Sequence, residues 1–475
     1  MTRLILTLAL ATVAFAQTRR QPPPPNRPME PAPAPAKPKP FAVPPRESFK
    51  LANGLQVSMV QYGEAPLVSM AVVVQAGILN EGPGEDALSS LTAELMKEGA
   101  GSRSSQQLAE EASSMGGSLA INASNDTTTA RLGVLSEFAA PAMRLLADVV
   151  QKPMLPDSEY PRIQAALLRN LAVGKSRPSF LAEDGLAHAM FPAGHPYARA
   201  FPDETLVGKH TAEDVKKFHA AQFGAARSRI YIVGKFDRAQ MKQAVEQAFA
   251  SWKRGPEIIR NVPKMEAKRQ VLFFDRPNSE QAVVRFAVPI PLDPTQPDFI
   301  PMQVADSLLG GSFISRITTN IREEKGYTYS PGSSVRNNYK SAFWVHNSEI
   351  ANKYATPAVK EILKELSRLR AEPPSDEELG RIKAEMAGTF VIRNASNNGV
   401  LQQLAYVDSQ GLTDDYLRTY VNKVQAVNRA DIQRLAETYL NPAKMTYVVV
   451  GDKSKIQEAV DFLQSGQESA RPTAK

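Results

Sequence analysis

The chain has 475 residues, of which 43% are hydrophobic and 22% are charged, so it has the composition of a globular protein and is long enough for more than one hydrophobic core. It contains no cysteine, which excludes disulfides, thiolate metal sites and a cysteine nucleophile. The formal net charge of +7 is spread along the chain without a dense basic cluster, and we therefore do not expect nucleic-acid binding.

The first residues have the pattern of a secretory signal peptide. Residues 1–16 contain Arg3, an apolar stretch over residues 4–13 and a small-x-small cleavage pattern. No later run of about 18 apolar residues follows, so we expect no transmembrane segment and a periplasmic or extracellular location. Residues 17–46 are rich in proline and predict an extended linker, while residues 465–475 predict a polar tail.

The folded part is predicted to begin with strands. The sequence FKLANGLQVSMVQ predicts a β-hairpin that turns at Asn53-Gly54, and residues 68–76 predict a buried strand.

The two halves of the chain contain an internal repeat. Residues from Thr211 match residues from Asn428, and this alignment pairs Asp214 with Asp431 at a separation of 217. Each half is predicted to have strands, a helix, more strands, a helix pair, and then a helix, a strand and a helix. The repeat therefore predicts an α+β fold made of two homologous units, each an antiparallel-rich sheet with helices packed on it.

Residues 315–330, SRITTNIREEKGYTYS, predict an amphipathic helix that buries Ile317 and Ile321 and ends at Gly326 in the left-handed conformation. Arg322 and Tyr329 then flank the helix end, where a cation and a phenol can together hold a carbonyl or an oxyanion. The alternative is a structural role, in which Arg322 pairs with neighbouring glutamates and Tyr329 is a half-buried strand residue.

The repeat and its motifs resemble the pitrilysin and insulinase superfamily, which includes the mitochondrial processing peptidases. The motifs that carry the resemblance include NGLQV, GAGSRSSQQLAEEASSMGGSL, FPAGHPYAR, LLGGSFISRI and IREEKGYTYS. The resemblance implies a clam-shaped tandem repeat. We expect a first domain over residues 47–253, a linker over residues 254–268 and a second domain over residues 269–464.

Active members of this superfamily carry an inverted zinc motif, H-x-x-E-H, and a further glutamate on a later helix. In the equivalent helix of this chain, ALSSLTAELMKEGA, the three motif positions are occupied by Ser90, Ala93 and Glu94. The distant ligand position falls at Arg169 or Asn170, and neither residue is a suitable zinc ligand. The first domain is thus predicted to have a degenerate zinc site, and we expect this chain to bind no metal.

The remaining histidines and serines predict no other catalytic centre. No two of the five histidines are three or four residues apart, as a pair on one helix face would be. The histidines are His188, His195, His210, His219 and His346. Glu94 and Glu98 are four residues apart on one helix. The pair is a weaker candidate for a divalent-ion site than for part of a solvated helix face. The sequence also lacks the G-x-S-x-G elbow of serine hydrolases. Alone, the chain is not expected to hydrolyse peptides.

The resemblance gives Arg322 and Tyr329 a specific role. In the two-domain members, the second domain carries an arginine and a tyrosine seven positions apart that face the zinc of the other subunit. The resemblance also implies a substrate-binding edge strand, where GGSLAINAS contains Asn122 two positions beyond the usual place. A shift of two residues keeps a side chain on the same face of a strand, so Asn122 stays a candidate for substrate binding.

We therefore expect a zinc-less partner subunit of an exported heterodimeric metallopeptidase. A partner chain of the same family is expected to carry the zinc, and Arg322 and Tyr329 are expected to orient the peptide substrate and stabilise the oxyanion there. The alternative is a non-enzymatic peptide-binding or structural subunit of a larger assembly. A third reading, an autonomous metallopeptidase with rebuilt ligands, has the least support in the sequence.

Overall fold

A computed structural model describes residues 44–466. The predicted signal peptide, nearly all of the predicted proline-rich linker and most of the predicted polar tail lie outside these residues.

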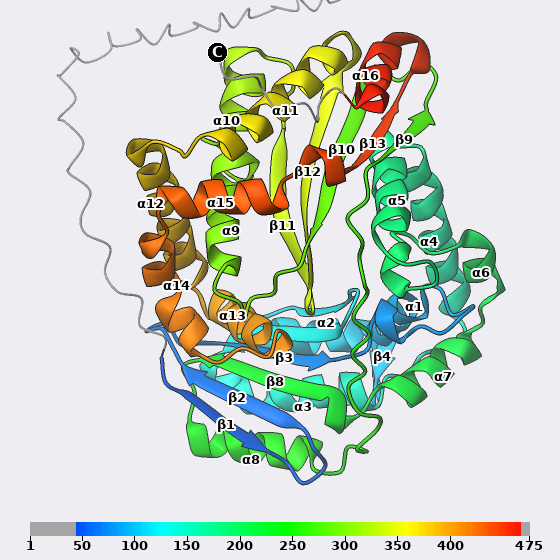
Figure 1. Ribbon diagram of the computed structural model, residues 1–475. Coiled ribbons are helices and arrows are strands. Elements are labelled where there is room, and N and C mark those ends of the chain that lie inside the picture. The colour runs from blue at the N-terminus through cyan, green and yellow to red at the C-terminus, as the bar shows by residue number, and fades with distance from the viewer. Residues whose placement is uncertain (1–43, 467–475) are drawn as a thin grey trace, which may run out of the picture. The chain divides into compact units, whose positions relative to one another are not determined.

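The first half contains a six-stranded sheet with the order β1-β2-β8-β3-β7-β6 (Figure 1). Its strands are β1 (Arg46–Lys50), β2 (Gln56–Gln61), β3 (Leu67–Val74), β6 (Leu119–Ala123), β7 (Thr128–Leu135) and β8 (Ser228–Gly234). A two-stranded ribbon joins β4 (Gly99–Ala100) to β5 (Arg103–Ser104). The helices of this half are α1 (Leu88–Leu95), α2 (Ser105–Ser114), α3 (Ala139–Gln151), α4 (Tyr160–Lys175), α5 (Pro178–Met190), α6 (Glu204–Lys209), α7 (Ala212–Gln222) and α8 (Arg238–Phe249).

The second half contains a five-stranded sheet with the order β11-β12-β10-β13-β9. Its strands are β9 (Gln270–Asp275), β10 (Gln281–Ile290), β11 (Gly332–Asn338), β12 (Ser341–Ala351) and β13 (Thr446–Gly451). Its helices are α9 (Phe299–Asp306), α10 (Arg316–Thr318), α11 (Ala355–Ala371), α12 (Asp376–Arg393), α13 (Asn397–Ser409), α14 (Asp415–Ala426), α15 (Arg429–Tyr439) and α16 (Lys453–Ser465). Two π-helical segments, Ser307–Gly311 and Thr319–Glu324, continue α9 and α10.

The two sheets share one topology. The order β2-β8-β3-β7-β6 of the first sheet matches β9-β13-β10-β12-β11 of the second. In the first sheet β8 pairs parallel with β2, and in the second β13 pairs parallel with β9. All other pairs in the two sheets are antiparallel. The predicted fold class, an antiparallel-rich α+β repeat, is confirmed.

Local sequence signals explain matching helix starts in the two halves. Thr211 and Asp214 form a capping box at the start of α7, and Asn428 and Asp431 form the same box at the start of α15. Each box satisfies two backbone N–H groups that the first helical turn leaves without partners. The aspartates are the pair that the internal repeat aligns.

Each half lends one helix to the sheet of the other half. In α5, Ala182, Leu186 and Met190 share a core with Val283 of β10 and Val448 of β13. Conversely, α13 packs against β3 and β8, and its buried leucines belong to the same core as residues of both sheets. Residues 254–268 contain no helix or strand, and the division into two domains at this segment stays a prediction.

Candidate functional site

The helix that corresponds to the zinc motif is held at its start by a buried carboxylate. Glu81 is 7% exposed and lies at the N-terminus of α1. Its carboxylate accepts hydrogen bonds from the Ala87 N–H at 3.1 Å, the Ser89 N–H at 3.0 Å and the Ser89 hydroxyl at 2.6 Å. Burial raises the pKa of Glu81, although these hydrogen bonds act in the opposite direction. The carboxylate therefore serves as the cap of α1.

The motif positions themselves do not form a metal site. Ala93 is 1% exposed and has no ligand atom, while Glu94 points outward and accepts a hydrogen bond from the Lys97 ammonium at 2.6 Å. Arg169 and Asn170, the candidates for the distant ligand, are exposed on α4. Zinc needs three or four N, O or S ligands around one point, and these residues do not fit it.

An ion pair occupies the space beside Ser90. The Arg199 guanidinium pairs with the carboxylate of Asp86, whose side chain is 3% exposed, and both residues line a cavity of about 30 Å³ together with Ser90. A guanidinium at this point would repel a divalent cation. Within residues 44–466, no three His, Cys, Asp or Glu side chains are grouped as metal ligands would be.

The structure brings Arg322 and Tyr329 together at the end of a helix. The segment 316–324 is helical but changes from α- to π-helical geometry at Thr319. Ile317 and Ile321 are fully buried and Gly326 has a φ of +63°, as predicted. The extra residue of a π-helical turn changes which side chains share a face.

The Arg322 guanidinium lies between two aromatic rings. Its Cζ is 4.3 Å from the ring centroid of Phe313 and 4.9 Å from that of Tyr329. Both rings are well exposed, at 59% for Phe313 and 80% for Tyr329. The Arg322 Nε lies 3.3 Å from a carboxylate oxygen of Glu323, so Arg322 does pair with a neighbouring glutamate, as the structural alternative expects. The other part of that alternative, a half-buried strand position for Tyr329, is wrong, because this residue lies in a loop and its ring is the more exposed of the two.

Tyr329 lines a polar hollow of about 640 Å³ on the second sheet. Arg285 of β10 and Arg336 of β11 line the same hollow. The Arg336 guanidinium donates a hydrogen bond at 2.6 Å to Glu183 of α5, and the Arg285 guanidinium forms an ion pair with the same carboxylate at 2.6 Å. Burial opposes ionisation of Glu183, but the hydrogen bond from Arg336 and the charge of Arg285 together lower its pKa. The Arg285 Nε is buried and has no hydrogen-bond partner in the described residues.

Sequence reasoning missed this arginine pair. Arg285, Arg336 and Glu183 belong to three elements that are far apart in the chain, and none of them lies in a recognisable motif. Only the contact of α5 with the second sheet brings them together.

Asn122 lies away from this hollow, on β6 at the end of the first sheet. It pairs with Thr129 of β7, and its side chain is exposed on the same face as Ala120. Ile121 between them is buried on the opposite face. The shift of two residues therefore keeps the side chain on one face of the edge strand.

Two successive parts of the chain match known families. Residues 57–200 match the family described as "Insulinase (Peptidase family M16)", and residues 209–386 match the "Peptidase M16 inactive domain". A crystal structure of a peptidase M16 inactive domain from Pseudomonas fluorescens is 25% identical and has a TM-score of 0.80, covering 86% of this chain and 98% of that chain.

Several relatives carry names with different functional meanings. An "Uncharacterized zinc protease" of Rickettsia bellii is 22% identical over 340 residues, which are 71% of this chain and 81% of that protein. The "Non-peptidase homolog YmxG" of Helicobacter pylori is 22% identical over 376 residues, 78% of this chain and 85% of that protein. "Cytochrome b-c1 complex subunit 1, mitochondrial" of Bos taurus is 25% identical over 211 residues, 44% of this chain and 43% of that protein.

Proposed function

Because the chain belongs to the peptidase M16, or insulinase, family and carries no inverted zinc motif, we propose that it is the zinc-less partner subunit of a heterodimeric M16 metallopeptidase. The partner chain in this proposal has the zinc motif. This chain closes the peptide chamber and contributes Arg322 and Tyr329 to the substrate.

The observation that carries the proposal is the placement of the Tyr329 phenol. Tyr329 is 80% exposed, lines a hollow of about 640 Å³ and is in contact with a guanidinium. A tyrosine at such a position contributes nothing to a hydrophobic core. A phenol that is accessible and oriented by a neighbouring cation is suited to bind a group from another molecule.

The chemistry follows from the two side chains. The Tyr329 hydroxyl donates a hydrogen bond to the oxygen on which negative charge develops when a peptide carbonyl is attacked. Loss of one such donor in other hydrolases costs about 3 to 4 kcal/mol of transition-state stabilisation. The Arg322 guanidinium orients the peptide backbone and keeps the phenol in position.

The partner and the location are part of the proposal. A relative of this chain is named as a subunit of the cytochrome b-c1 complex, so assembly with other chains has a precedent in the family. We propose a periplasmic or extracellular location because residues 1–16 have the pattern of a signal peptide. No helix within residues 44–466 has the length and apolar character needed to cross a bilayer.

A second candidate is a non-enzymatic peptide-binding or structural subunit. The contact of Arg322 with Phe313 and Tyr329 favours it, since a cation between two rings stabilises a loop without any substrate. The exposed edge strand β6 with Asn122 suits the addition of an extended peptide in either case.

The experiment that tests the proposal is purification of the tagged chain from its own host, followed by native mass spectrometry, zinc analysis and a peptide-hydrolysis assay. The proposal predicts a second chain of similar size, about one zinc per pair and peptidase activity. A zinc-free, inactive monomer or homodimer would instead support the non-enzymatic candidate.

A further inference from the structure

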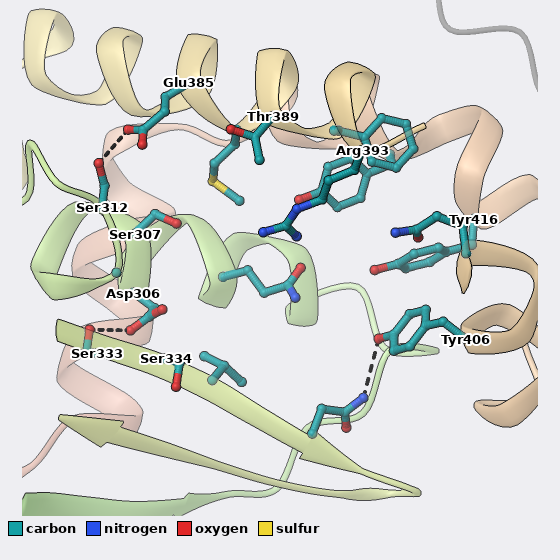
Figure 2. A pocket seen from close by; sticks show the side chains of 18 residues that line it. Asp306, Ser307, Ser312, Ser333, Ser334, Glu385, Thr389, Arg393, Tyr406 and Tyr416 are labelled. Carbon is teal, nitrogen blue, oxygen red and sulfur yellow. Dashed lines mark hydrogen bonds between the residues drawn. The ribbon is translucent and has the colours of Figure 1, made fainter. Parts of the chain in front are cut away.

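A second polar cavity lies in the second half of the chain, apart from the hollow that contains Tyr329. It has a volume of about 510 Å³ and is lined by α9 with its π-helical continuation, β11, α12, α13 and α14 (Figure 2). This volume is within the range of about 300–1,000 Å³ typical of small-molecule sites. Most of its lining is polar, which is unusual for a space between helices that serves only for packing.

One end of the cavity is acidic. Asp306, which is 7% exposed, accepts hydrogen bonds from the Ser333 hydroxyl at 2.5 Å and the Trp344 indole N–H at 2.8 Å, both to the same carboxylate oxygen. Glu385 of α12 accepts a hydrogen bond from the Ser312 hydroxyl at 2.5 Å. Figure 2 shows these two carboxylates on opposite walls of the same end of the cavity. This end is suited to an ammonium group.

The other end offers a guanidinium and phenols. Arg393 lies two turns beyond Glu385 on α12 and extends into the cavity, and Tyr406 and Tyr416 line the wall beyond it (Figure 2). Burial raises the pKa of Tyr406 to about 12, and burial likewise raises the pKa of Tyr416, so both phenols stay protonated and can donate hydrogen bonds. A guanidinium that shares a cavity with phenolic donors is suited to a carboxylate.

Two buried polar atoms of the lining have no partner within the described residues. These atoms are the side-chain carbonyl oxygens of Gln303 and Asn337. Buried polar atoms are nearly always hydrogen-bonded in folded proteins, so their place in the lining indicates that a polar molecule completes the site.

We propose that this cavity binds a dipeptide by both of its free termini, with the ammonium group at Asp306 and Glu385 and the carboxylate at Arg393. The inference does not depend on the proposed role of Tyr329, and it can be tested on this chain alone.

The length of the ligand follows from helix geometry. Glu385 and Arg393 are eight residues apart on one helix, which corresponds to about 12 Å along its axis. An extended peptide spans about 3.5 Å per residue, and each terminal hydrogen bond adds about 2.8 Å, so a dipeptide fills this distance. A free amino acid is about 3 Å too short to reach both ends, and a tripeptide is about 4 Å too long.

The test is calorimetric titration of the purified chain with di-alanine, its N-acetylated form and its C-terminal amide at pH 7. Binding of di-alanine and at least tenfold weaker binding of each blocked form are expected. Absence of binding at millimolar di-alanine, or a loss for only one of the two blocked forms, would overturn the proposal.

Variants of α12 assign the two ends. In Glu385→Gln, N-acetylation should cost less affinity than in the parent chain, because only Asp306 then holds the ammonium group. In Arg393→Gln, amidation should cost little further affinity. Glu377→Gln and Arg381→Gln are matched controls, because these exposed residues of the same helix do not line the cavity, and they should bind as the parent chain does. The assignment would be contradicted if the control variants bound di-alanine as weakly as the cavity variants do. It would also be contradicted if blocking a terminus cost the cavity variants as much affinity as it costs the parent chain.

Discussion

The Arg322 guanidinium lies against the ring of Tyr329, with its Cζ 4.9 Å from the ring centroid. The two residues are seven positions apart, and the helix end at Gly326 turns the chain back between them. Their contact fixes an exposed phenol at the edge of a polar hollow. A conformationally restricted donor loses less entropy on binding a substrate than a mobile one does.

The phenol hydroxyl can be removed without removing the contact. In the complex with the zinc subunit, Tyr329→Phe should lower kcat by about 10²- to 10³-fold, because it deletes one donor to the oxyanion and keeps the ring against Arg322. Thermal stability should change little, since the side chain is 80% exposed. Steady-state kinetics on the purified pair measures the effect.

Tyr339→Phe is the matched control for this substitution. Tyr339 also has an arginine over its ring, with the Arg260 Cζ at 4.0 Å from the centroid, but it does not line the hollow of Tyr329. Its substitution should leave kcat unchanged. An equal loss in both variants would indicate a general structural effect and remove the catalytic role from Tyr329.

The ion pair beside Ser90 should be important for stability. Arg199→Ala leaves the carboxylate of Asp86 buried at 3% exposure without its cation, and unpairing a buried charge is strongly destabilising. Since Arg199 itself is 29% exposed, we expect a loss of about 2 to 3 kcal/mol in the free energy of unfolding. Urea denaturation measures it. The double variant Asp86→Ala/Arg199→Ala should recover part of the loss, and no recovery would contradict a role for charge pairing.

Asp306 should make stability depend on pH in an uncommon direction. Burial raises its pKa from 3.8 to about 6, although hydrogen bonds from Ser333 and Trp344 oppose the shift. The folded chain therefore binds this proton more tightly than the unfolded chain, so the contribution of Asp306 to stability falls as pH rises from about 4 to about 6. The total change is about 3 kcal/mol, from about two pKa units.

A variant isolates this contribution from those of other carboxylates. The free energy of unfolding of the parent chain, relative to that of Asp306→Asn, should fall as pH rises from about 4 to about 6. Denaturant unfolding at pH 4, 5, 6 and 7 provides the values. A difference that stays constant with pH would contradict the raised pKa.

The exchange of helices should make the two halves unfold together. The chain has two tryptophans, Trp252 in the core of the first half and Trp344 in the core of the second. Trp344→Phe leaves a fluorescence reporter in the first half, and Trp252→Phe leaves one in the second. In each variant the fluorescence transition in urea should coincide with the far-UV circular dichroism transition, because α5 and α13 each pack on the sheet of the other half. Two separated steps would contradict this coupling.

Helix positions and the sheet topology could be predicted from the sequence where the signal was local or repeated. The alignment of Asp214 with Asp431 predicted two homologous units, and the structure has matching capping boxes at these residues and one topology for both sheets. The apolar spacing of Ile317 and Ile321 and the glycine at position 326 predicted the helix that positions Arg322.

Contacts between distant segments were outside the reach of sequence reasoning. The pairing of Arg199 with Asp86, the grouping of Arg285 and Arg336 around Glu183, and the stacking of Phe313 on Arg322 depend on tertiary packing. The change to π-helical geometry at Thr319 also has no signal in composition or periodicity, since one extra residue per turn alters few of the apolar positions.

The most direct test of the proposed function is peptide hydrolysis by the zinc-binding partner, measured alone and after stepwise addition of this chain. Little activity is expected for either chain alone, and activity should rise and saturate at one copy of this chain per partner. Full activity of the partner alone, unchanged by addition of this chain, would contradict a role for this chain as the second subunit of the peptidase.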